Sequence, residues 1–200
     1  MSVPTLTGQR VRLEPLRPDH FDALLPLALD ERVFRYMIAW FRTPQDFRLW
    51  FDRALNQAAA GIDTPWATVD LATNAVVGST RLADLDRYHQ TAELGHTWLT
   101  PTAQGTGLNS EAKFLQLQHA FEDLGLYRVE LRTHHLNLRS QAAILKLGAV
   151  YEGTFRNHFL MPDGTRRHTK YYSITREDWP QVKSQLEQKL RSAPALPPSA

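Results

Sequence analysis

The hydrophobic and polar positions of this chain follow two periods, and the change from one to the other marks the first elements. Residues 9–14 (QRVRLE) alternate at every second position, which is typical of a half-buried strand, and residues 19–29 then take a helical spacing. A second helix is predicted over 44–60, because Thr43 can cap its start, Pro44 suits its first turn and a glycine follows its end. The front of the chain is therefore expected to form a strand followed by two helices.

Three strand-like runs come next, at 66–72, 75–85 and 91–99. Only short turns separate them, so they are expected to form an antiparallel meander. A glycine-containing loop then leads into a predicted helix, whose apolar positions at helical spacing are Phe114, Leu117, Phe121 and Leu124. Residues 127–133 form a further strand-like run, so this part of the chain is expected to be a crossover unit.

The last third predicts a helix and a hairpin. Asn137 can cap a helix that runs through Lys146. Residues 149–161 and 166–175 flank the turn sequence PDGT, which favours two antiparallel strands joined by a tight turn.

Composition favours a single folded unit. The chain has 200 residues and a mass of 22.9 kDa, and its 42% hydrophobic content suits one sizeable core. After a C-terminal helix predicted at 177–190, the chain is rich in proline and alanine. We therefore expect one domain over 1–191 and a disordered tail over 192–200.

Residue usage also narrows the chemistry. The absence of cysteine excludes disulfides, thiolate zinc sites and a cysteine nucleophile, and favours a cytoplasmic location. The eight histidines show no helix-spaced pair, and His134 and His135 are expected to point opposite ways on a strand, so no metal site is predicted.

Charge and hydropathy argue against two kinds of partner. Lys and Arg exceed Asp and Glu only by 23 to 21 and are scattered, which disfavours nucleic-acid binding. No apolar run approaches the roughly 20 residues that span a bilayer, so no membrane partner is expected. An anionic cofactor is compatible with this charge balance.

The loop TAQGTGLNSEAK, residues 102–113, is the strongest candidate for binding such an anion. Closely spaced glycines let successive backbone N–H groups point at one phosphate, and the following helix adds the positive end of its dipole. A plain strand-to-helix turn is the alternative. A nucleoside triphosphate loop is disfavoured because Leu108 follows the second glycine, and a dinucleotide fold is disfavoured because the loop lies in mid-chain.

With the segments RVRLEPLRPDHFDAL, AELGHTWL and NLRSQAAILKLGAVYEGTFRNH in this order around the loop, the chain resembles the GNAT superfamily of N-acetyltransferases, in its RimJ/RimL branch. Gln104 and Gly107 match the Q/R-x-x-G-x-G/A signature, and Asn109 replaces its last small residue. The resemblance implies an α/β (α+β) GNAT fold, with a mixed, strongly curved sheet flanked by helices. Acetyl-CoA would lie between two splayed strands with its pyrophosphate on the loop.

The resemblance also implies which residues bind the cosubstrate. They are Trp98, Leu99, Gln104, Gly105, Thr106, Gly107, Leu108, Asn109, Ser110 and Asn137. Asn137 would contact the pantetheine arm, and a plain helix-capping role is the alternative, compatible with the first.

Two residues are candidates for catalysis by the same resemblance. Glu93 matches a position from which family members present a carboxylate, and through water it could accept the proton of the amine. A purely structural role for Glu93 is the alternative, and His96 is a weaker substitute. Ser140 stands three residues after Asn137, where the branch is thought to use a serine to assist thiolate departure; a hydroxyl bonded to the helix start is its alternative.

The chain departs from the family at three further positions. Ile144 occupies the position at which a family tyrosine often protonates the thiolate. Phe159 lies near the position of the branch's catalytic carboxylate, and His168 occupies that of an aspartate usual in the last strand. These departures leave the base and the acceptor open.

The expected function is acetyl transfer from acetyl-CoA to a primary amine. The branch resemblance favours the α-amine of a protein or peptide N-terminus as the acceptor. A small amine, including an antibiotic or toxin, is the alternative, and a non-catalytic acyl-CoA-binding module is an alternative of another class. The sequence leaves a homodimer open.

Overall fold

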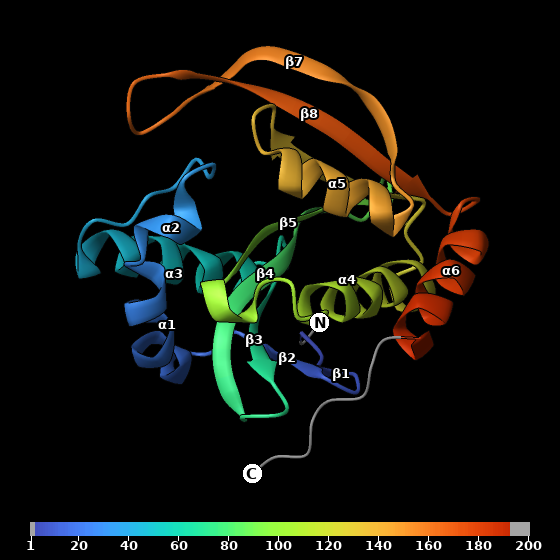
Figure 1. Ribbon diagram of the computed structural model, residues 1–200, viewed down its shortest axis with the longest axis horizontal. Coiled ribbons are helices and arrows are strands. Elements are labelled where there is room, and N and C mark those ends of the chain that lie inside the picture. Colours follow the sequence, from blue (N-terminus) through green and yellow to red (C-terminus); the bar gives the residue numbers. More distant parts are fainter. Residues whose placement is uncertain (1–2, 193–200) are drawn as a thin grey trace.

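The computed structural model describes residues 3–192, so the expected tail lies outside the described residues from residue 193 onward (Figure 1). Eight strands form one mixed sheet in the order β1-β2-β3-β4-β5-β6-β8-β7. The strands are β1 Leu6–Thr7, β2 Val11–Pro15, β3 Thr64–Asp70, β4 Ala75–Asp86, β5 Thr91–Leu99, β6 Arg128–His134, β7 Val150–Leu160 and β8 Arg166–Thr175.

Helices connect and cover the strands. They are η1 Pro18–His20, α1 Phe21–Ala28, α2 Glu31–Phe34, α3 Pro44–Ala59, η2 Pro101–Ala103, α4 Leu108–Gln118, η3 His119–Asp123, α5 Leu138–Leu147 and α6 Trp179–Ser192. The helix expected at 19–29 is thus split into η1 and α1, and the one after the glycine loop ends in the π-helical segment η3. No described helix is long and apolar enough to cross a membrane.

The pairing of the strands confirms the mixed sheet. Neighbouring strands are antiparallel except β5 and β6, which are parallel. These two pair only from Thr91 with Arg128 to Glu93 with Glu130. Beyond Glu93, β5 continues to pair with β4, whereas β6 pairs with β8 as far as His134. The sheet therefore opens between β5 and β6, and we call this opening the fork.

Two hydrophobic cores cover the two faces of the sheet. One includes Leu117, Val129 and Ile174 and joins the sheet to α4, α5 and α6. The other includes Phe47 and Phe51 and joins it to α1, α2 and α3. Figure 1 shows these two groups of helices on opposite sides of the molecule, with the β7–β8 hairpin crossing above them. The side chains at the fork consequently face one helical layer or the other.

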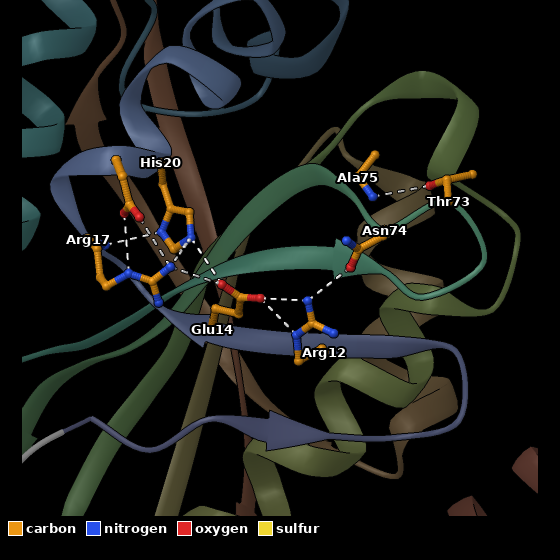
Figure 2. A network of polar contacts seen from close by, with 8 residues as sticks. Arg12, Glu14, Arg17, His20, Thr73, Asn74 and Ala75 are labelled. Atoms are coloured by element: carbon orange, nitrogen blue, oxygen red, sulfur yellow. Dashed lines mark hydrogen bonds and ion pairs between the residues drawn. The ribbon is translucent and has the colours of Figure 1, made fainter.

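A polar network joins β2 to the helical layer that follows it (Figure 2). The carboxylate of Glu14 on β2 accepts hydrogen bonds from Arg12 at 2.8 Å and Arg17 at 3.3 Å, and it lies 3.3 Å from His20 Nε2. Arg12 also donates to Asn74 in the β3–β4 turn at 3.0 Å. Although partial burial opposes ionisation, the hydrogen bonds from Arg12 and His20 lower the pKa of Glu14. We assign this network a structural role.

Candidate active site

The glycine loop leads from the end of β5 into α4. Gly105 and Gly107 have φ values of 80° and 94°, in the left-handed region that side chains other than glycine rarely adopt. The backbone N–H groups of Gly105, Thr106 and Gly107 donate to no group within residues 3–192. The first-turn N–H groups of α4 have no intrahelical acceptor either. This cluster of free donors at a helix start fits a phosphate group.

Gln104 holds the loop between two other elements. Its amide nitrogen donates to the carbonyl of Leu99 at 2.9 Å, and its amide oxygen accepts from Arg139 of α5 at 2.5 Å. The hydroxyl of Thr106 closes the turn by donating to Ala103 O at 2.8 Å. Arg139 was not predicted as a site residue. It places a cation beside the free N–H groups, which adds to their attraction for an anion.

Glu111, also missed by the sequence analysis, anchors the first turn of α4. Its buried carboxylate accepts backbone N–H groups from Gln9 at 2.8 Å, Arg10 at 2.8 Å and Val11 at 3.1 Å. The partners lie about 100 positions away in sequence, so no local pattern could reveal this contact. The contact joins the β1–β2 turn to the helix that carries the glycine loop.

A bulge shapes the β5 side of the fork. The register between β4 and β5 shifts between Ser79 and Arg81, opposite His96, whose φ is 50°. After the bulge, the side chain of Trp98 is 3% exposed and packs in the core with α1–α3, while Leu99 is 6% exposed and packs in the other core. Both side chains therefore pack in the cores, and contact of these two residues with the cosubstrate stays a prediction.

Glu93 lies at the base of the fork and forms an ion pair with Arg132 of β6. Arg132 also contacts Asp84 at 3.3 Å and donates to the hydroxyl of Tyr171 at 3.3 Å. The guanidinium of Arg132 holds this carboxylate in place at the base of the fork. The contact shows a structural role for Glu93, and its role as a base stays a prediction.

His96 is less suited to act as a base. Burial, with the charges of Arg81 and Arg53, lowers the pKa of His96 to about 3. The imidazole is therefore neutral at pH 7 and binds a proton weakly.

The start of α5 presents the second catalytic candidate. Asn137 caps the helix through its side-chain oxygen, which accepts the backbone N–H of Ser140 at 3.0 Å. The hydroxyl of Ser140 makes no hydrogen bond to any described residue, so it is available to a ligand. Ile144, at the position of the family tyrosine, is 7% exposed and belongs to the core.

Three of the remaining predicted residues start α4. Leu108 is buried in the core, and Ser110 is exposed. The side-chain oxygen of Asn109 is buried without a hydrogen-bond partner in the described chain. A ligand that donates to Asn109 would remove the cost of that unpaired oxygen.

The predicted separation of two histidines is wrong. The rings of His134 and His135 stack at 4.6 Å, and His135 lies 4.6 Å from His168. Strand alternation does not apply, because β6 ends at His134. Among residues 3–192, no group of three His, Cys, Asp or Glu side chains is arranged to hold a metal ion.

Comparison with known proteins assigns the family. Residues 10–150 match the acetyltransferase (GNAT) domain, and the chain belongs to this family. It is therefore a GNAT N-acetyltransferase, as the resemblance in sequence implied, and GNAT enzymes use acetyl-CoA.

Individual relatives agree with this assignment. The chain is 28% identical to FsC-acetyl coenzyme A-N(2)-transacetylase of Aspergillus fumigatus, over 96% of this chain and 85% of that protein. It is similar to the crystal structure of a GCN5-related N-acetyltransferase from Brucella melitensis, with TM-score 0.85, 28% identity, and 94% and 86% of the two chains covered. Mycobacterium smegmatis RimJ, in complex with CoA-disulfide, has TM-score 0.81 at 20% identity, with 96% and 98% covered, and shares the fold.

Proposed function

We propose that this enzyme acetylates α-amines, and that its foremost acceptor is the N-terminus of a protein or peptide. The observation that carries this proposal is the fork, which has the ion-paired carboxylate of Glu93 at its base and the free N–H groups of Gly105–Gly107 at the adjoining loop. One end suits an anionic cosubstrate, and the other suits an amine that must lose a proton.

The residues around the fork fit acetyl-CoA. The N–H groups between Gly105 and Ser110 that are unpaired in the described chain, with the guanidinium of Arg139, would hold its pyrophosphate, whereas the N–H of Gln104 already donates to the carbonyl of Pro101 at 3.3 Å. Backbone groups of Trp98 and Leu99 would align the pantetheine arm along β5, and Asn137 would contact that arm from the start of α5. Bound acetyl-CoA supplies the thioester that is the acetyl donor.

The transfer assigns a role to each catalytic candidate. The amine nitrogen bonds to the thioester carbonyl carbon, the carbon–sulfur bond breaks, and CoA departs as a thiolate. Glu93 accepts the amine's proton through a water molecule. The hydroxyl of Ser140 donates a hydrogen bond to the sulfur as charge develops there.

An α-amine suits the weak base that the site offers. Its unperturbed pKa is about 7.7 to 8.0, so its deprotonation at pH 7 costs only about 1 kcal/mol, against about 4 to 5 kcal/mol for lysine. Phe159 and His168 offer no carboxylate in place of the family's usual ones. We therefore rank α-amines above internal lysines.

A small molecule with an α-amine is the second candidate acceptor. The relative that spans 96% of this chain carries the name of an N(2)-transacetylase, whereas the RimJ/RimL resemblance favours a protein N-terminus. Membership of an acetyltransferase family favours either over the non-catalytic module. A cytoplasmic location and a homodimer stay predictions.

The acceptor class can be tested by thiol release from acetyl-CoA with two matched peptides. One has a free N-terminus and no lysine; the other has a blocked N-terminus and one internal lysine. We expect the first to react at least tenfold faster at pH 7, and mass spectrometry should place the acetyl group on its α-amine. Faster acetylation of the blocked peptide would overturn the ranking.

A further inference from the structure

A second bulge places a histidine beside the fork. The register between β7 and β8 shifts between Phe155 and Phe159, and Asn157 in this interval has φ 50°. The ring of His158 lies 3.9 Å from Phe159 and 5.9 Å from Tyr171, and its Nδ1 is buried without a partner in the described chain. Bulges near active sites commonly redirect a side chain, and this one brings His158 over Tyr171.

Arg167 lies farther along the same face of the sheet. Arg132 pairs with Tyr171 and His134 with Thr169, so Arg167, two positions from Thr169, faces the same side as Arg132. The carbonyl of Tyr36, just after α2, accepts a hydrogen bond from Arg167 at 3.4 Å. The side that these residues share therefore faces the helical layer of α1–α3.

Arg167 is a buried cation with only neutral partners. It is 7% exposed, and besides Tyr36 it contacts the hydroxyl of Thr169 at 3.1 Å and the ring of Phe159 at 5.7 Å. No carboxylate of residues 3–192 forms an ion pair with it. A cation removed from water without an anionic partner is costly, and an incoming anion would offset that cost.

The other charged groups near Arg167 leave it uncompensated. Arg132 is engaged by Glu93 and Asp84. Asp163 in the hairpin turn acts on His134, but its carboxylate accepts two hydrogen bonds from Thr165.

The ionisation states of Arg167 and His158 at pH 7 suit the binding of an anion. Burial, with the charge of Arg132, lowers the pKa of Arg167 to about 10, so it is still a cation at pH 7. Partial burial and the charges of Arg132 and Arg167 lower the pKa of His158, so this ring is neutral at pH 7. Its N–H can donate a hydrogen bond to an anion.

We propose that Arg167 and His158 recognise a carboxylate on the acceptor and thereby select α-amines that carry an acidic group nearby. The proposal rests on the α-amine acceptor proposed above and specifies its class. Glu93 would face the amine at one end, and Arg167 would bind the carboxylate at the other.

The distance between the fork and Arg167 sets the length of the acceptor. Tyr171, opposite Arg132, and Arg167 are four residues apart on β8, which is about 13 Å of strand. Side chains and an extended peptide of one or two residues span such a distance. An aspartate or glutamate at the first or second position of a peptide meets the requirement.

The test uses tripeptides with free N-termini that differ only in glutamate against glutamine at one of the first two positions. For the wild-type enzyme we expect kcat/KM by thiol release to be about tenfold higher for the acid, because only its charged carboxylate offsets the buried charge of Arg167; tenfold corresponds to about 1.4 kcal/mol. In Arg167→Met the acid and the amide should react equally, and Arg167→Lys should restore part of the preference. Equal rates for the acid and the amide with the wild-type enzyme would overturn the proposal without any variant.

Arg166→Met is the matched control. Arg166 is exposed, adjacent on β8 and on the opposite face, so this variant should keep the full preference. Unchanged CoA affinity and melting temperature would show that Arg167→Met is folded; a preference that survives in this folded variant contradicts the role of Arg167. If neither tripeptide is acetylated, the proposed function fails, and calorimetry of their binding to the CoA-loaded enzyme still decides whether the acid binds more tightly.

Discussion

Ser140 and Glu93 differ in how the surrounding fold holds them. The carboxylate of Glu93 is fixed by Arg132, whereas the hydroxyl of Ser140 has no partner in the described chain and only its backbone N–H is used, by Asn137. Removing Glu93 would therefore leave the charge of Arg132 less compensated. Removing the hydroxyl of Ser140 leaves the helix cap intact, so Ser140 can be tested without a structural cost.

We predict that Ser140→Ala lowers turnover about tenfold and leaves the affinity for CoA unchanged. The hydroxyl matters as negative charge develops on sulfur, which is a loss of transition-state stabilisation of about 1.4 kcal/mol. Single-turnover kinetics under conditions where chemistry limits the rate, with calorimetry for CoA, would measure both quantities. Ser184→Ala on the exposed side of α6 is the control. Normal turnover in Ser140→Ala would remove Ser140 from the mechanism.

At the scale of elements, the glycine loop can be tested through charge alone. Nothing lies within 4 Å of a side chain added at Gly105, so a substitution there meets no clash, although its φ of 80° strains any L-residue. Gly105→Asp and Gly105→Asn share that strain and differ in charge. We expect the aspartate to weaken CoA binding at least tenfold more than the asparagine, because it opposes the pyrophosphate.

Calorimetric titration with CoA measures this difference, and thermal melting shows whether the two variants are equally folded. Equal CoA affinities would mean that the phosphates bind elsewhere.

Local pattern predicted most of the elements, because their signals lie within a few residues. Thr43 and Pro44 start α3 as expected, and the PDGT turn joins β7 to β8. The two-residue strand β1 and the four-residue helix α2 were missed, since neither is long enough to show a period.

The candidate site was less predictable than the fold, since its contacts join distant parts of the chain. The fork depends on where two strands stop pairing, and the ion pair of Glu93 with Arg132 depends on their parallel register. The contact of Glu111 with β2 and the unpaired charge of Arg167 likewise arise only once separate elements meet. The roles of the cosubstrate residues came from the family resemblance and stay predictions.

At the scale of the whole molecule, a further charged group lies buried between the sheet and α4. Lys113 of α4 is buried, and its ammonium donates to Thr80 of β4, to Thr97 of β5 and to the side-chain oxygen of Gln116. It thereby ties the helix of the glycine loop to two strands, one of which borders the fork. Burial lowers the pKa of Lys113 to about 7, well below its value in an unfolded chain.

This burial predicts how global stability depends on pH. Between about pH 7 and 10 the unfolded chain holds the Lys113 proton and the folded chain releases it, so the Lys113 contribution to the unfolding free energy rises with pH, by up to about 1.4 kcal/mol per unit. Lys113→Met removes this rise, and Lys146→Met on the exposed side of α5 should keep it. Urea unfolding of the wild type and both variants at pH 7, 8 and 9 measures the slopes. Because other titrating groups are common to all three proteins, a wild-type slope equal to that of Lys113→Met would show that the buried amine does not titrate in this range.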